Sequence, residues 1–176
     1  MAIGKKNGLD PDSFFTVAQE LIHQTGYVTG KSDEAHYWKT LRGKTGIPGA
    51  DQEYRKEILK RFVLRDQMLR VVKTLRSSGM ITAILSDQTN WLDEINKRSP
   101  FYYHFDFVFN SYVLKKSKRD PSVFKDVCTL IGIKPRQAIF VDDNITNTKN
   151  AESAGLRTIH FLNVKDFEKE LANLLR

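Results

Sequence analysis

The chain has 176 residues, of which 40% are hydrophobic, and a formal net charge of +7. A chain of this length suits one globular domain, or one domain with a small appendage. No apolar run approaches the ~20 residues that a membrane-spanning helix needs, so we expect no membrane partner, and the basic excess favours an anionic one.

The cysteine content and the first residues of the sequence favour one cellular location for the protein. Cys128 is the only cysteine, so the chain has no internal disulfide framework. Residues 1–8 lack the apolar core of a signal peptide. We therefore expect a cytoplasmic protein. Aromatic residues are not interleaved with basic ones, as nucleic-acid stacking would require, so a small phosphorylated molecule is the favoured partner over nucleic acid.

The first third of the chain, residues 9 to about 64, carries apolar residues at helical spacing. Asp10-Pro11-Asp12-Ser13 and Ser32-Asp33-Glu34 each predict a helix start, and Asp51 could cap a third helix. Short amphipathic helices bury little surface by themselves. The sequence therefore predicts a small, all-helical, cap-like region over residues 1–65 that packs on another domain.

After Arg65 the pattern changes to helices that alternate with short apolar runs. The runs that read as strands are 81–85, 105–109, 138–141 and 158–161. Strands that alternate with helices favour a parallel sheet with right-handed crossovers and helices on both faces. The predicted fold class is thus α/β, with a Rossmann-like core over residues 66–176 and the helical cap before it.

The predicted strand 138–141 leads directly into Asp142, Asp143 and Asn144. In an open α/β sheet, ligands bind at the carboxyl ends of the strands. Two adjacent carboxylates there favour a hard cation such as Mg²⁺. The alternative is that Asp143 or Asn144 only caps the helix that follows.

Two further residues follow predicted strands or precede predicted helices. The hydroxyl of Ser86 and the first N–H groups of the next helix would form an anion site, or Ser86 is an ordinary N-cap. Lys118 would carry a positive charge to the same sheet edge, or it belongs to a solvated basic run over residues 115–119.

These elements form a combination that is more specific than any one of them. In chain order they are Leu85-Ser86-Asp87, Lys118-Arg119-Asp120-Pro121 with Phe124, Phe140-Val141-Asp142-Asp143, Asn147, and Ala154-Gly155-Leu156. Together they resemble the haloacid dehalogenase-like (HAD) hydrolase superfamily over essentially the whole chain. One small departure is Arg119, where the family usually has proline.

The resemblance implies a role for each matched residue. Ser86 would bind the transferred phosphoryl group, with Asp87 and Lys118 in the same phosphate site. Lys118 would also neutralise charge on the nucleophile. Asp142 would be a metal ligand for Mg²⁺, and its companion Asp143 would be catalytic together with Ser86 and Lys118.

The first motif of the family, a nucleophilic aspartate followed two residues later by an acid/base aspartate, has no clear counterpart. Asp10 and Asp12 have the spacing, but no strand precedes them, so helix capping is the favoured role and Asp10 is only the weaker candidate nucleophile. The resemblance then implies a phosphatase-type protein that is inactive as written and binds Mg²⁺ weakly or not at all. The alternative is a non-catalytic phosphate-binding or protein-interaction module. A dehalogenase ranks lower, because the Asp142–Asp143 pair suits a metal-dependent branch.

The family's first strand lies between the strands that end at Ser86 and Asp142, so its loss would open a gap in the sheet. Three outcomes stay open. The strands 81–85 and 138–141 pair directly, a second chain or homodimer partner fills the gap, or the sequence is a shortened form of a longer gene product.

Overall fold

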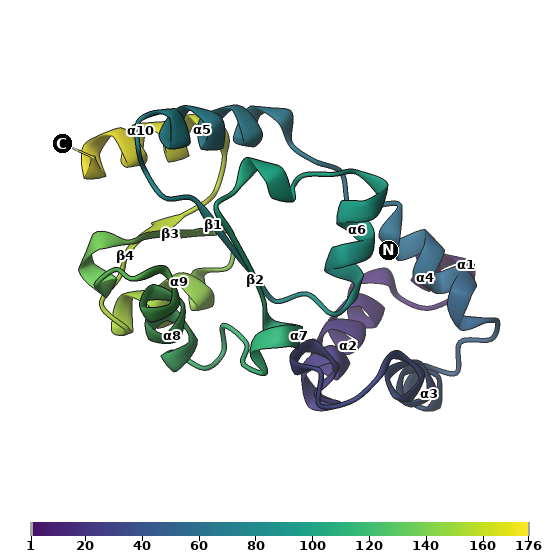
Figure 1. The fold of residues 1–176 in the computed structure, drawn as a ribbon. Coiled ribbons are helices and arrows are strands. Elements are labelled where there is room, and N and C mark those ends of the chain that lie inside the picture. The colour runs from purple at the N-terminus through teal and green to yellow at the C-terminus, as the bar shows by residue number, and fades with distance from the viewer. Residues whose placement is uncertain (1, 176) are drawn as a thin grey trace. The chain divides into compact units, whose positions relative to one another are not determined.

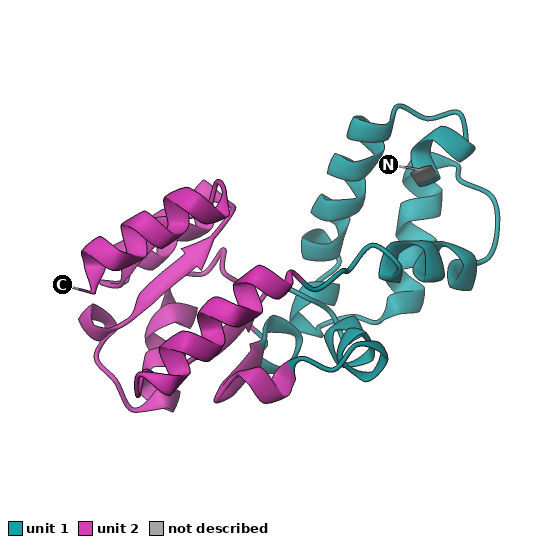
Figure 2. Ribbon diagram, turned by 90° about the horizontal axis from the view of Figure 1, so that it is seen from above, with its two compact units in different colours: residues 1–64, 87–101, 110–115 teal, residues 65–86, 102–109, 116–176 magenta. Residues whose placement is uncertain are grey.

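The computed structural model describes residues 2–175, which form two compact units (Figure 2). Unit 1 comprises the chain up to Leu64, together with Asp87–Phe101 and Asn110–Lys115. Unit 2 comprises Arg65–Ser86, Tyr102–Phe109 and the chain from Lys116 onward. None of the described helices is long and apolar enough to cross a bilayer.

Apart from its loops and Asn110, the last residue of a strand, unit 1 is helical (Figure 1). Its α-helices are α1 (Ala2–Lys6), α2 (Pro11–Gln24), α3 (Glu34–Thr45), α4 (Asp51–Leu59), α6 (Trp91–Arg98) and α7 (Ser111–Leu114), with a 3-10 turn η1 (Tyr27–Thr29). The side chains of Asp10 and Asp33 each accept a backbone N–H at 2.8 Å and cap α2 and α3, which confirms the cap role predicted for Asp10 and the helix start predicted at Ser32-Asp33-Glu34. The prediction for Asp51 is wrong by one residue, because Ala50 holds the cap position of α4.

An aromatic cluster forms the core of unit 1. Five of its rings are at most 5% exposed and contact one another with centroids 5.0–6.1 Å apart: Tyr27, Tyr37, Trp38, Tyr54 and Trp91. Large rings remove much apolar surface from water and add ring–ring attraction. Four of them come from residues 27–54 and one from α6, so this cluster joins the segment after Ser86 to the N-terminal helices.

The carboxylate of Glu34 accepts hydrogen bonds from three rings of that cluster. It accepts hydrogen bonds from the indole Nε1 of Trp38 and of Trp91, both at 2.9 Å. The hydroxyl of Tyr27 donates to it at 3.3 Å, and Arg55 Nε lies 3.2 Å away. Buried aromatic N–H groups need such a partner, so Glu34 allows two tryptophans to enter the core.

Alkaline pH is expected to weaken unit 1 through Tyr37. Burial raises the pKa of Tyr37 above its usual value near 10. Its stabilising contribution is therefore complete below about pH 10 and is lost as the pH rises, because the unfolded chain ionises first. The loss reaches about 1.4 kcal/mol per pH unit. Urea unfolding followed by tryptophan fluorescence between about pH 9 and about pH 12 measures it, and both tryptophans lie in unit 1.

The matched control is Tyr37→Phe, which removes the ionisable group and keeps the ring. In this variant the unfolding free energy should change less steeply with pH, because one fewer group releases a proton on unfolding. Equal slopes in the wild type and the variant would contradict the assignment.

Unit 2 contains the strands and confirms the α/β fold class. Its elements are α5 (Asp66–Ser77), β1 (Ala83–Ser86), η2 (Tyr102–His104), β2 (Phe107–Asn110, whose last residue counts with unit 1), α8 (Ser122–Ile131), η3 (Pro135–Gln137), β3 (Ile139–Asp142), α9 (Ile145–Ser153), β4 (Arg157–His160) and α10 (Val164–Leu174). All four predicted strands are present, each with a boundary shifted by one or two residues.

The strands form two separate pairs (Figure 1). β3 and β4 pair in parallel, with Ile139 opposite Arg157 and Asp142 opposite His160. β1 is hydrogen-bonded to β2, and neither belongs to the sheet of β3 and β4. Direct pairing of the strands that end at Ser86 and Asp142, one of the three outcomes considered above, is therefore wrong for this structure.

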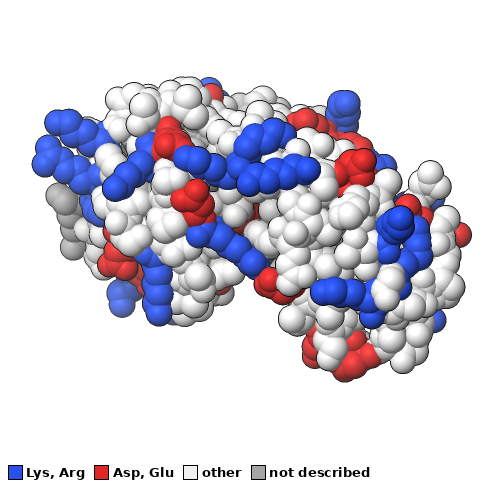
Figure 3. Space-filling view, turned by 90° about the horizontal axis from the view of Figure 1, so that it is seen from below, with Lys and Arg blue, Asp and Glu red and all other residues white. Residues whose placement is uncertain are grey.

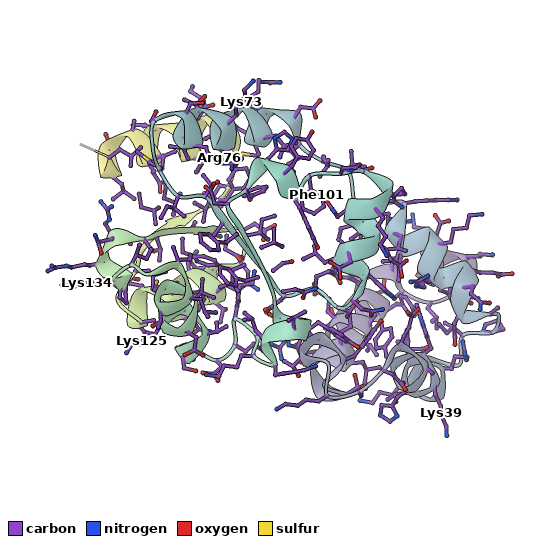
Figure 4. All side chains as sticks on the ribbon, in the orientation of Figure 1. Lys39, Lys73, Arg76, Phe101, Lys125 and Lys134 are labelled. Atoms are coloured by element: carbon purple, nitrogen blue, oxygen red, sulfur yellow. The ribbon has the colours of Figure 1, made fainter. Side chains whose placement is uncertain are left out.

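The start of β1 is fixed by polar contacts. Asp106 accepts from the backbone N–H and the hydroxyl of Thr82 at 2.9 and 3.0 Å, and from Arg76 Nε at 2.8 Å. These donors lower the pKa of Asp106, the Thr82 backbone bond most of all. Arg76 projects from α5 (Figure 4) and also binds the carbonyl of Tyr103, so α5, β1 and η2 are tied at one point.

Candidate functional site

The centre of the candidate site is an ion pair between Lys118 and Asp142. Lys118 Nζ donates to Asp142 Oδ2 at 2.6 Å, and the two side chains are only 11% and 7% exposed. Asp142 is the last residue of β3, and Lys118 precedes α8. The ammonium also lies 5.8 Å from the ring centroid of Phe140. Lys118 is thus no part of a solvated basic surface, and that alternative for it is wrong.

Helix α9 positions the other oxygen of Asp142. Asp142 Oδ1 accepts from the backbone N–H of Asn144 at 2.8 Å and from Asn147 Nδ2 at 3.1 Å. Asn144 also caps α9, since its side chain accepts from the N–H of Thr146, so the helix-cap role weighed for Asn144 is confirmed. The carboxylate of Asp142 is therefore fixed by its place at the end of β3 and by hydrogen bonds from the cap residue and from a side chain of α9.

A third asparagine on α9 holds the loop that carries the lysine. Asn150 Nδ2 donates to the backbone carbonyl of Lys118 at 3.0 Å. Asn150 was not predicted as a site residue. The signal was present, because asparagines at 144, 147 and 150 recur every third residue and so share one face of the helix.

The remaining predicted residues divide between the two units. Ser86 is half-buried as the last residue of β1 in unit 2, and Asp143 is exposed directly after β3. Asp87 belongs to unit 1, where it accepts from the hydroxyl of Ser111 at 2.6 Å. Asp10 also lies in unit 1 and caps α2, and the Ser13 backbone bond lowers its pKa.

The alternative that Ser86 is the N-cap of the next helix is wrong. Helix α6 begins at Trp91 with Asn90 at its cap position, so Ser86 does not stand in its first turn. The residues between them form polar contacts inside unit 1 instead. Asn110 Nδ2 donates to the carbonyl of Thr89 at 2.9 Å, and both residues are buried.

The carboxylate expected to hold magnesium, that of Asp142, is engaged by protein donors. Among residues 2–175, no group of three or more His, Cys, Asp or Glu side chains is placed to hold a metal. Asp142 already accepts hydrogen bonds from Lys118, Asn144 and Asn147. Mg²⁺ is usually bound through one or two carboxylates together with waters and phosphate oxygens, so here it would share Asp142 with the ammonium of Lys118.

Unit 2 as a whole carries a net positive charge. The segments of unit 2 contain more Lys and Arg than Asp and Glu. Figure 3 shows basic side chains spread over the face in view, with acidic side chains between them. A net positive unit attracts small anions at a distance.

The sequence matches a family model described as a hydrolase, haloacid dehalogenase-like hydrolase, over residues 10–155. The bifunctional epoxide hydrolase 2 of Rattus norvegicus is 32% identical over 99 residues, which cover 52% of this chain and 18% of that protein. The matched segment therefore spans less than a fifth of the length of that relative.

Solved structures show the same fold. A HAD family enzyme from Bacteroides thetaiotaomicron has a TM-score of 0.75 at 22% identity, over 97% of this chain and 86% of that one. The wild-type form of that enzyme in complex with magnesium and inorganic phosphate has a TM-score of 0.65 at 21% identity, over 84% and 82% of the two chains. Since the family model covers most of the sequence, the chain belongs to the haloacid dehalogenase-like hydrolase family.

Proposed function

We propose that this chain carries the phosphate-binding part of a phosphatase-type HAD site and does not by itself turn over its ligand, a small phosphorylated molecule. The observation that carries the proposal is the buried Lys118–Asp142 pair at the carboxyl end of β3. A lysine held in place by a carboxylate and an asparagine-bound loop is a fixed positive charge that can bind a phosphate oxygen.

The proposed lack of turnover rests on the role of Asp10. A covalent mechanism needs a nucleophile that attacks phosphorus. Asp10-x-Asp12 is the one Asp-x-Asp pair in the sequence, and Asp10 is occupied as the N-cap of α2 in unit 1. Lys118 and Ser86 would then bind and orient the phosphoryl group, and no side chain would be in place to accept it.

Magnesium would have a limited role in this proposal. The metal-bound structure of the Bacteroides enzyme makes Mg²⁺ plausible for the family. In this chain Asp142 would be its main ligand, and the ion would supply charge neutralisation for the phosphate. We expect weak binding, because the ion would compete with Lys118 for the same carboxylate.

Two measurements test the proposal together. Purified protein comprising residues 1–176, with Mg²⁺ and a generic aryl phosphate, should show no turnover above an Asp142→Ala control. Inorganic phosphate should nevertheless shift the amide resonances at the start of α9 in NMR spectra. Lys118→Ala should weaken that binding about tenfold or more, because a hydrogen bond to a charged group contributes about 1.5–3 kcal/mol.

The control for charge is Lys125→Ala. Lys125 is exposed and projects from α8 of the same unit (Figure 4), so its removal changes the net charge equally and should leave phosphate binding almost unchanged. If the wild type hydrolyses the aryl phosphate and Asp142→Ala does not, the proposal that the chain is inactive is wrong. Absence of phosphate binding in the wild type would overturn the phosphate site.

A further inference from the structure

The backbone at Lys115 adopts a left-handed conformation. Its φ is +61° and its ψ is 14°. Among residues 2–175, it is the one residue other than glycine that has a positive φ. A residue with a Cβ atom adopts this region at a cost in free energy and stays there when surrounding contacts hold it. The conformation of Lys115 therefore directs attention to the contacts that fix it.

The side chain of Lys115 is held inside unit 1. Its Nζ donates to the backbone carbonyl of Gly30 at 3.2 Å and lies 5.0 Å from the ring centroid of Tyr112. Tyr112 belongs to α7, and its ring contacts that of Tyr27 in the aromatic core, with centroids 6.2 Å apart. Gly30 ends the turn η1. The ammonium of Lys115 is thus bound to η1 and to α7 at once.

Position 30 has no room for a side chain beside Lys115. Gly30 has a φ of +58°, and a Cβ atom there would lie 2.7 Å from the backbone carbonyl oxygen of Tyr112. That atom would also overlap Lys115 Nζ. Glycine is the residue that permits both a positive φ and such a close approach of two backbones. It therefore allows the Lys115 ammonium to reach the carbonyl at the end of η1.

The residues after Lys115 carry the chain into the candidate site. Lys115 is the last residue of its segment of unit 1, and Lys116 begins a segment of unit 2 (Figure 2). Lys116 Nζ donates to Ser122 Oγ on α8 at 3.0 Å. Lys115 is exposed, whereas Lys118 is 9% exposed. Three residues span at most about 11 Å, so the direction of the backbone at Lys115 limits where Lys118 can lie.

We propose that Lys115 is a positioning residue for the phosphate site, because its left-handed conformation, held by unit 1, places the ammonium of Lys118. The inference rests on the proposed function, in which Lys118 binds the phosphate. Lys118 reaches Asp142 through its side chain and Asn150 through its backbone carbonyl. Both contacts require its backbone to be correctly placed. Contacts of the helical unit near Gly30, distant from Lys118 in sequence, therefore act on phosphate affinity.

Two substitutions at position 115 separate the conformation from the charge, since both remove the ammonium. Asparagine enters the left-handed region more readily than other residues with a side chain, whereas β-branched valine is strongly disfavoured there. Lys115→Val should therefore weaken the binding of inorganic phosphate to the protein comprising residues 1–176 about fivefold, as measured by NMR titration of the α9 amides. Lys115→Asn should bind phosphate within about twofold of the wild type.

The side-chain amide of Asn150 reports on the position of Lys118 without any ligand, because its Nδ2 donates to the Lys118 carbonyl at 3.0 Å. Its NMR resonances should shift in Lys115→Val and stay close to their wild-type positions in Lys115→Asn. If they shift in this way but the wild type binds no phosphate, Lys115 positions Lys118 and the proposed function is wrong. Unchanged Asn150 resonances in Lys115→Val, or equal loss of phosphate affinity in the two variants, overturns the positioning role.

A variant at position 30 tests the same contact from the side of unit 1. Gly30→Ala introduces the Cβ atom that overlaps Tyr112 and Lys115. Gly46→Ala is the matched control, because Gly46 also has a positive φ, +69°, and a Cβ atom there meets none of the described residues within 4 Å.

Both alanine variants should lower the stability of unit 1, measured by urea unfolding with tryptophan fluorescence, because both place a Cβ atom at a positive φ. Gly30→Ala alone should also weaken phosphate binding and shift the Asn150 resonances. Equal phosphate affinity of the two variants would mean that the contact of Lys115 with Gly30 does not act on the site, and contradicts the proposal.

Discussion

Lys118→Met is expected to lower the free energy of unfolding of unit 2 by about 3–5 kcal/mol. The side chain of Asp142 is 7% exposed and pairs with the ammonium at 2.6 Å. Without the ammonium, a buried carboxylate keeps only the donors of Asn144 and Asn147. Breaking one side of a buried pair costs more than removing both, because the remaining charge stays out of water.

The measurement has to report on unit 2 alone. Both tryptophans of the chain lie in unit 1, so their fluorescence does not follow this site directly. Native-state hydrogen exchange of the α9 amides does, since the slowest of them report the opening free energy of that region. The variant should raise their exchange rates by a factor of about a hundred or more.

A double variant tests whether the loss comes from the unpaired charge. Asp142→Asn keeps an oxygen for the two asparagine donors and removes the charge. Lys118→Met combined with Asp142→Asn should therefore cost less than the two single changes added together, with a coupling of at least about 1 kcal/mol. Lys125→Met, the exposed control on α8, should stay within about 0.5 kcal/mol of the wild type. If Lys118→Met costs no more than Lys125→Met, the pair does not stabilise the strand end.

Local signals in the sequence predicted the elements well. Asp10 and Asp33 precede apolar residues at helical spacing, and both cap helices in the structure. The apolar run before Asp142 predicted β3 and placed the site residue at its end. These features depend on neighbours within a few residues, which is the range over which capping and periodicity act.

Features that depend on contacts distant in sequence were not predicted. Helix α6 packs with the N-terminal helices because Trp91 donates to Glu34, 57 positions earlier. The short helix α1 was also missed, because Gly4 and its basic neighbours give no apolar periodicity. Ile81, expected inside a buried strand, is 54% exposed and precedes β1. The division of the sheet was anticipated only as a gap, since pairing partners are set by tertiary contacts.

Glu34→Ala is expected to destabilise unit 1 by about 2–4 kcal/mol. The change leaves the Nε1 groups of Trp38 and Trp91 without their acceptor, and the residues that carry them are only 1% and 2% exposed. Each buried donor that loses its partner costs about 1–3 kcal/mol. Urea unfolding followed by tryptophan fluorescence measures this loss of stability in unit 1, which contains both tryptophans.

Two further variants separate the hydrogen bonds of Glu34 from its charge. Glu34→Gln keeps one acceptor oxygen and replaces the other by an N–H₂ group, so its cost should lie between those of the wild type and Glu34→Ala. Glu53→Ala removes an exposed carboxylate on α4 of the same unit and should change stability by less than about 0.5 kcal/mol. If Glu34→Ala unfolds at the same urea concentration as Glu53→Ala, the two indole groups find other partners. Glu34 would then not be the contact that holds α6, and with it the segment after Ser86, in the helical unit.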